Sequence, residues 1–169
     1  MELVLLGYMA SGKSTISKKI AKILDVDFID LDDYISEKEG DTIKNIFKNK
    51  GEIYFRIQEN KYLNELLNGK KNIVLAIGGG TPCYSNNMDL INKKATSMYL
   101  KATLNSLYTR LIQEQAERPL VSELNNDKLK EYIAKHLFER APFYERANYT
   151  ISIDDKSIED IIEEIQHLI

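Results

Sequence analysis

The sequence predicts an α/β fold in which five parallel strands form one sheet between two layers of helices. Short apolar segments alternate with stretches of helical periodicity along the whole chain. The 169 residues, of which 43% are hydrophobic, are enough for one domain with a substantial core. No repeat, low-complexity tract or linker-like segment divides the sequence, so we expect a single domain over residues 1–169.

Five apolar segments are predicted to be strands: residues 3–6, 26–29, 73–77, 95–100 and 149–153. Ile16, Ile20 and Leu24 mark one face of a helix after the first strand, and Ser157 is the expected N-cap of a last helix. Strands separated by helices need crossover connections, which favour a parallel sheet covered on both faces. Such sheets bind ligands at the carboxyl ends of their strands, so we expect the chemistry there.

Charge and composition argue against several classes of function. The net charge of −3 gives no electrostatic reason to expect nucleic acid or a membrane surface as a partner. A single cysteine, Cys83, excludes an intrachain disulfide and favours a reducing compartment. No apolar run approaches the roughly 20 residues that span a bilayer, and no leader peptide is expected. We therefore expect a cytoplasmic monomer that acts on small molecules.

The segment after the first predicted strand carries a phosphate-binding pattern. Gly7, Gly12, Lys13 and Ser14 satisfy G-x-x-x-x-G-K-[ST] between a strand and a helix, which is the P-loop arrangement. Glycine lets backbone N–H groups converge on phosphate oxygens, and the helix directs its positive end at the same anion. Lys13 would neutralise the β and γ phosphates, and Ser14 would ligate Mg²⁺. The pattern predicts a nucleoside triphosphate site.

The P-loop alone does not distinguish a GTPase, a motor ATPase and a small-molecule kinase. The guanine-reading pattern N-K-x-D does not occur, and the chain is short for a motor domain. Three further features point to an anionic polyol as the second substrate. Asp30 and Asp32 lie at the end of the second predicted strand, Arg56 lies in a helix among glutamates, and Gly78–Gly80 follow the third strand. Asp33 is assigned to the charge of a helix N-terminus.

Taken in order, the motifs resemble those of the shikimate kinase family. The segments are "GYMASGKST", "DLD", "GEIYFR", "GGG", "RPL" and "RAPFY", and they cover nearly the whole chain. The resemblance implies a three-layer α/β/α P-loop kinase fold, with an acceptor-binding segment at about residues 31–62 and a lid at about 112–126. It also implies transfer of the γ-phosphoryl group of ATP to the 3-hydroxyl of shikimate, with Mg²⁺ as cofactor.

On the acceptor side, the resemblance assigns a role to each matching residue. Asp32 would bind the shikimate hydroxyls and take the proton of the attacking one. Arg56 and Arg140 would hold the carboxylate, for which planar guanidinium groups are well suited. The predicted substrate-binding residues are Asp32, Arg56, Gly78, Gly79, Gly80 and Arg140.

On the donor side, Asp30 would help to hold Mg²⁺ through water, and Ser14 would ligate the ion through its hydroxyl. Arg118 would close over the phosphates, and Arg110 aligns with an arginine near adenine. The predicted nucleotide-binding residues are Gly7, Ala10, Ser11, Gly12, Lys13, Ser14, Thr15, Arg110 and Arg118, and the predicted catalytic residues are Lys13, Asp32 and Arg118.

Two other functions stay open. A related P-loop kinase acting on gluconate would also bind a carboxylated polyol, although the "GGG" and "GEIYFR" segments favour shikimate. A nucleotide-binding module without transfer activity is the second alternative, and the presence of Asp32, Arg56, Arg118 and Arg140 argues against it. Arg56 itself could simply pair with Glu52 or Glu59 at a helix surface.

One position of the loop departs from the family pattern. Ala10 stands where these kinases usually place another glycine, at a variable position of the G-x-x-x-x-G frame. We expect a negative φ at Ala10, for which the methyl group costs little and stiffens the loop.

Overall fold

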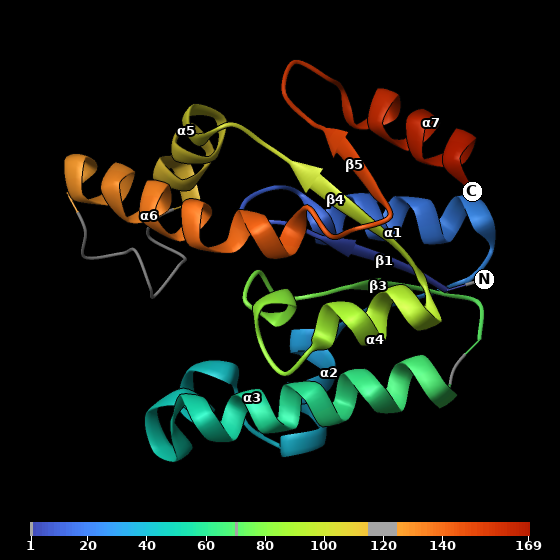
Figure 1. Cartoon of the computed structure of the whole chain (residues 1–169), viewed down its shortest axis with the longest axis vertical. Helices are drawn as coiled ribbons and strands as arrows, with labels where there is room; N and C mark the ends of the chain where they lie inside the picture. Colours follow the sequence, from blue (N-terminus) through green and yellow to red (C-terminus); the bar gives the residue numbers. More distant parts are fainter. Residues whose placement is uncertain (1, 70, 115–124) are drawn as a thin grey trace.

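The computed structural model describes residues 2–69, 71–114 and 125–169, and it contains one five-stranded sheet (Figure 1). All four strand pairs are parallel, in the order β2-β3-β1-β4-β5. The strands are β1 (Glu2–Leu6), β2 (Asp27–Asp30), β3 (Ile73–Ala76), β4 (Thr96–Lys101) and β5 (Tyr149–Ser152). The predicted α/β fold and its five strands are therefore confirmed.

Helices cover both faces of the sheet. The chain moves from β1 to β2 in one direction and from β2 through β3 and β4 to β5 in the other. Because crossover connections are right-handed, these two directions place their helices on opposite faces. One face carries α1 (Lys13–Leu24) and α7 (Ile158–Leu168), which contact each other. The other face carries α2 (Leu31–Glu39), α3 (Ile43–Gly69), η1 (Thr81–Cys83), α4 (Asn87–Lys94), α5 (Leu104–Glu114) and α6 (Asn126–Tyr144).

The core lies on both sides of the central strand β1. Leu3, Val4, Leu5 and Leu6 are all fully buried, which accounts for the continuous apolar run in the sequence. Val4 lies opposite Leu75 of β3 in the parallel register. This topology also positions the site, because the connection after β1 passes to one face and those after β3 and β4 pass to the other. The crevice between them lies beyond the carboxyl end of β1.

Several element ends differ slightly from the prediction. The expected strand at 26–29 runs from Asp27 to Asp30, because the N–H of Val26 bonds to Ala21 and belongs to the end of α1. The predicted cap of α7 is confirmed as a capping box in which Ser157 and Asp160 bond to each other's backbone. Within the described ranges, no helix is long and apolar enough to cross a membrane.

Helix α3 is two helical segments joined by a kink. Gly51 has φ 83° and ψ 169°, which is not helical, and the segment after it carries Arg56. Figure 1 shows α3 beneath α4, with α2 beside it. The segment after the kink contacts α2 through Tyr54 and Tyr62 and also carries Arg56, which faces the turn after β3.

Candidate active site

A cavity of about 380 Å³ opens at the carboxyl end of the sheet. The lining residues come from the P-loop, the start of α2, the end of β3 and α5: Met9, Ala10, Gly12, Lys13, Ser14, Thr15, Asp30, Asp32, Ile77, Gly78, Gly79 and Arg110. Most predicted donor residues and both predicted aspartates therefore meet in one place. Arg56 and Arg140 do not line this cavity, but they lie beside the Gly78–Gly80 turn, whose first two residues do.

The P-loop is shaped by contacts within the loop and with β4. A Cβ on Gly7 would lie 2.8 Å from the carbonyl oxygen of Leu100, so this position has room only for glycine. The carbonyl of Tyr8 accepts from the N–H of Ser11 at 3.2 Å and from the Lys13 ammonium at 2.8 Å. Gly12, with φ 84°, leads directly into α1, so the first N–H groups of α1 face the cavity.

The expectation of a negative φ for Ala10 is wrong. Its φ is 62°, in the left-handed region. The cause is the turn closed by the bond from Ser11 to Tyr8, in which Ala10 is the third residue. A positive φ at that position is typical of a type II turn, which normally takes glycine. An alanine there stores about 1 kcal/mol of strain relative to glycine.

Asp30 connects the P-loop helix with the beginning of α2. One carboxylate oxygen accepts from the hydroxyl of Ser14 at 2.7 Å, and the other accepts from the N–H of Asp32 at 3.1 Å. Asp30 is thus the N-cap of α2, and Asp33 adds charge to the first turn as expected. The pair of hard oxygen ligands from Ser14 and Asp30 is the kind of donor set that Mg²⁺ prefers.

Asp32 reaches the cavity from a helix and not from a strand end as predicted. The cap at Asp30 starts α2 at Leu31, so Asp32 lies in its first turn. Burial, followed by the negative charges of Asp30 and Glu59, raises the pKa of Asp32 to about 7. A carboxylate with such a pKa is suited to proton transfer near neutral pH.

The turn at Gly78–Gly80 leaves room for charged side chains of the protein. A Cβ on Gly80 would lie 2.6 Å from Arg56 Nη2, and one on Gly79 would lie 3.4 Å from Arg140 Nη1. A Cβ on Gly78 would lie 3.2 Å from a carboxylate oxygen of Asp32. The turn therefore gathers two arginines and the aspartate around three consecutive residues. Two guanidinium groups in this arrangement can hold one carboxylate.

Arg56 is held by a buried network that sequence reasoning did not assign. Its Nη1 pairs with Glu59 at 2.8 Å, and the Glu59 side chain is only 1% exposed. Glu59 also accepts from the hydroxyl of Thr81 at 2.6 Å, which ties α3 to η1. Arg56 further pairs with Glu52 at 3.3 Å and lies 4.2 Å from the ring centroid of Tyr84. Arg56 makes both glutamate pairs considered from the sequence, yet it faces Gly80 and not the solvent.

The signal for Glu59 was present in the sequence as the i, i+3 spacing from Arg56. That spacing does not separate a surface pair from a buried one. Burial depends on Thr81 and Asn87, which reach α3 only in the folded chain, where Asn87 donates to the carbonyl of Thr81 at 2.8 Å.

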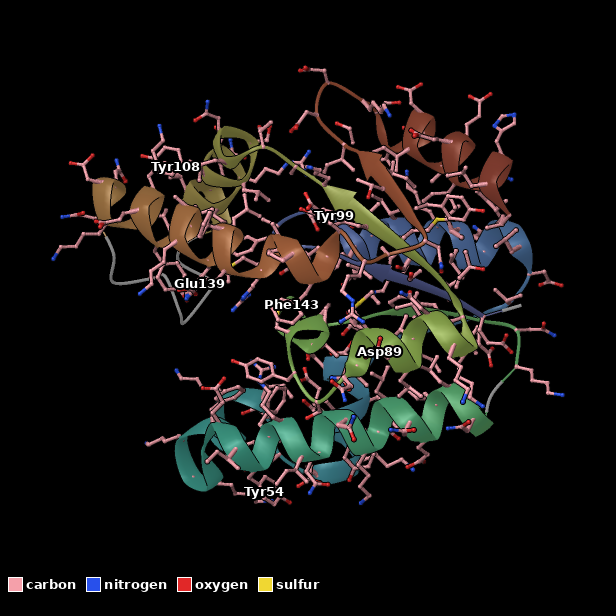
Figure 2. All side chains as sticks on the ribbon, viewed as in Figure 1. Tyr54, Asp89, Tyr99, Tyr108, Glu139 and Phe143 are labelled. Atoms are coloured by element: carbon pink, nitrogen blue, oxygen red, sulfur yellow. The ribbon has the colours of Figure 1, made fainter. Side chains whose placement is uncertain are left out.

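Arg140, on α6, lies among aromatic side chains. Its guanidinium is 5.6 Å from the ring centroid of Tyr8, and Tyr144 donates from its hydroxyl to the carbonyl of Gly79 at 2.5 Å. Tyr144 packs against Tyr99 of β4, which Figure 2 labels near the upper end of that strand. The figure also shows Phe143, the neighbour of Tyr144, beside η1, so this end of α6 adjoins the glycine turn.

A second polar cluster joins α2 to α3. Glu39 accepts from the hydroxyls of Tyr54 and Tyr62 at 2.6 and 2.8 Å and pairs with Lys50 at 3.1 Å. The two tyrosine hydrogen bonds lower the pKa of Glu39 to about 2. Tyr54 is labelled in Figure 2 on the first turn after the kink at Gly51. This cluster fixes α2, which carries Asp32, against the helix that carries Arg56.

Two arginines predicted for the nucleotide site remain, Arg110 and Arg118, and the structure describes only Arg110. Arg110 on α5 lines the cavity and donates to the carbonyl of Ala10 at 3.2 Å. Arg118 and most of the expected lid, residues 115–124, lie outside the described residues.

This fold and cavity define a P-loop kinase that acts on a small molecule, because a P-loop faces a carboxyl group and a pair of guanidinium groups. The family model described as "SKI: Shikimate kinase" matches residues 9–169. The chain belongs to the shikimate kinase family.

Individual proteins support the same assignment. A relative named "Shikimate kinase" from Flavobacterium johnsoniae is 42% identical over 165 residues, which cover 97% of this chain and 96% of the relative. The crystal structure of shikimate kinase from Bacteroides thetaiotaomicron is similar with a TM-score of 0.93 and 35% identity, covering 99% of this chain and 97% of that one. Shikimate kinase from Acinetobacter baumannii in complex with shikimate has a TM-score of 0.88 and 32% identity, covering 99% and 91%.

Proposed function

We propose that this protein transfers the γ-phosphoryl group of ATP to the 3-hydroxyl of shikimate. The product is shikimate 3-phosphate, an intermediate in the biosynthesis of chorismate and the aromatic amino acids. One observation carries the proposal: Asp32, Arg56 and Arg140 converge on a single glycine turn beside the P-loop cavity. A base for a hydroxyl and a clamp for a carboxylate are what the acceptor requires.

The donor half binds and orients the triphosphate. The N–H groups of the P-loop and the first turn of α1 point at phosphate oxygens, and Lys13 neutralises the transferring group. Ser14 and Asp30 would hold Mg²⁺, which would neutralise negative charge on the triphosphate. Arg110 lines the same cavity and is proposed to contact the nucleoside, and Arg118 is proposed to contact the phosphates.

The acceptor half positions one hydroxyl in line with the γ-phosphorus. Arg56 and Arg140 hold the carboxylate of shikimate, which fixes the ring against Gly78–Gly80. Asp32 accepts the proton of the 3-hydroxyl while that oxygen bonds to the γ-phosphorus. The bond from the γ-phosphorus to the bridging oxygen breaks, and ADP leaves with the electron pair. Catalysis then rests on position and charge, with no covalent intermediate on the protein.

A coupled assay of ADP release tests the proposal. The protein with ATP and Mg²⁺ should release ADP rapidly with shikimate, and only at a background rate with gluconate or without an acceptor. Mass spectrometry should detect one phosphoryl group on shikimate. Preference for gluconate would assign another acceptor, and tight ATP binding without any phosphorylated product would indicate a nucleotide-binding module. The same preparation, examined by sedimentation, tests the proposed monomer.

A further inference from the structure

Ala10 is the strained residue of the P-loop, and its strain lies where phosphate would bind. The residue has φ 62° at a turn position that normally takes glycine, and it lines the cavity. A strained backbone persists only when its surroundings hold it, and such positions concentrate at functional sites. The question is therefore which contact keeps Ala10 in this conformation.

The described contact that does so comes from far along the chain. Nη1 of Arg110 donates to the carbonyl of Ala10 at 3.2 Å, across a sequence separation of 100 residues. The helix segment that carries Arg110 is anchored in the core, because Leu107 and Leu111 of α5 are fully buried. A charged donor on an anchored helix makes a stronger bond to a carbonyl than a neutral donor does.

The carbonyl of Ala10 belongs to the peptide that also carries the N–H of Ser11. That N–H closes the turn onto Tyr8, whose carbonyl accepts the Lys13 ammonium. If Ala10 relaxed to a negative φ, the peptides on either side would rotate and the turn would open. The arrangement of Gly12, Lys13 and the following N–H groups depends on that turn.

We propose that Arg110 is a positioning residue for the P-loop. It holds the carbonyl of strained Ala10, and so keeps the loop in the phosphate-binding shape before the nucleotide arrives. This role rests on the proposed donor site and is separate from any contact between Arg110 and the nucleoside. We call the bond from Arg110 to the Ala10 carbonyl the latch. The latch should affect phosphate binding only while residue 10 is alanine, because glycine adopts the same φ without strain.

A double-mutant cycle with inorganic tripolyphosphate tests this role, because that ligand has no base or ribose. The variants are Ala10→Gly, Arg110→Gln and the two combined, each with Mg²⁺ and with tripolyphosphate affinity measured by calorimetry. In the wild-type chain, Arg110→Gln should weaken tripolyphosphate binding about fivefold to tenfold. In the Ala10→Gly variant, the same substitution should weaken it less than about twofold. Arg146→Gln removes an arginine that pairs with Asp89 instead, so it controls for the loss of one positive charge.

Each other outcome contradicts the latch in a recognisable way. Equal weakening in both backgrounds would mean that Arg110 contacts phosphate directly. Weakening for ATP but not for tripolyphosphate would mean that it contacts only the nucleoside. A wild-type chain that bound neither ligand would overturn the donor site and the latch together. Because the cycle needs no acceptor, a failure with shikimate in the kinase assay would leave its result unaffected.

Discussion

The phosphate-binding loop of the donor side is one uninterrupted segment, Gly7–Ser14, whereas the acceptor side gathers groups from α2, α3, the turn after β3 and α6. The first is mainly a matter of backbone shape, set by glycine, a turn and one strained alanine. The second is made of side chains, and buried partners such as Glu59 and Glu39 hold them. Substitutions within the loop should therefore act locally, whereas the acceptor side should also respond to substitutions of its supporting residues.

The largest effect should come from Lys13→Ala, because its ammonium is the group proposed to neutralise the transferring phosphoryl group. Phosphoryl transfer should fall by at least about 10²- to 10³-fold. Shikimate affinity, measured by calorimetry without nucleotide, should stay within twofold of the wild type. A parallel loss of shikimate affinity would show that the two halves are not separable.

Gly80→Ala should damage the acceptor half alone. The new Cβ would lie 2.6 Å from Arg56 Nη2, so the guanidinium group would have to shift from its present position. The KM for shikimate should rise about 10- to 100-fold, because a charged hydrogen-bond donor is lost. Gly69→Ala is the matched control, since a Cβ there meets nothing within 4 Å. An unchanged KM would remove Arg56 from the carboxylate clamp.

The raised pKa of Asp32 predicts a pH-dependent cost to stability in the nucleotide-free protein. The folded state holds a proton on this carboxyl up to about pH 7, whereas the unfolded chain releases it near 3.8. Stability from this group is therefore greatest at low pH and declines between these two values. Relative to the wild type, Asp32→Asn should gain on the order of 2 to 4 kcal/mol between pH 4 and pH 8. Urea unfolding of both proteins at each pH measures this, and a constant difference would contradict it.

The smallest effect should come from Glu39→Gln, because Glu39 acts on the acceptor only through the α2–α3 contact. Weaker bonds to Tyr54 and Tyr62 should raise the KM for shikimate about two- to fivefold, with little change in kcat. Glu65→Gln is a useful comparison. Glu65 also joins α2 to α3, through Tyr34 and Lys38, but its side chain is 46% exposed. Its effect should therefore be smaller, and a larger one would contradict this ranking.

The two halves also differ in how far the sequence predicted them. The P-loop could be predicted because its residues are adjacent and their spacing is the one that phosphate binding requires. The five strands could be predicted from apolar runs. The φ of Ala10 was predicted with the wrong sign, because the residue pattern does not show the turn that Ser11 closes onto Tyr8. Asp32 was expected at a strand end, because the alternation of residues along a strand does not reveal that Asp30 caps a helix beginning at Leu31.

The acceptor side needed the family resemblance. Arg56 and Arg140 are far apart in sequence, and no local pattern says that both face one glycine turn. Glu59 illustrates the limit, because its spacing from Arg56 is that of an ordinary surface pair. Its burial follows from the packing of α3 on η1 and α4.

The partners of the two arginines have a consequence for ionic strength. Arg56 is already paired with buried Glu59, so its local charge is largely balanced before any acceptor enters. Arg140 lies over the ring of Tyr8, and it forms no ion pair with another of the described residues. Added salt should therefore weaken acceptor binding mainly through Arg140, while Arg56 contributes directed hydrogen bonds that salt screens less. The carboxylate of the acceptor would then be held by the net charge of Arg140 and by the directed hydrogen bonds of Arg56.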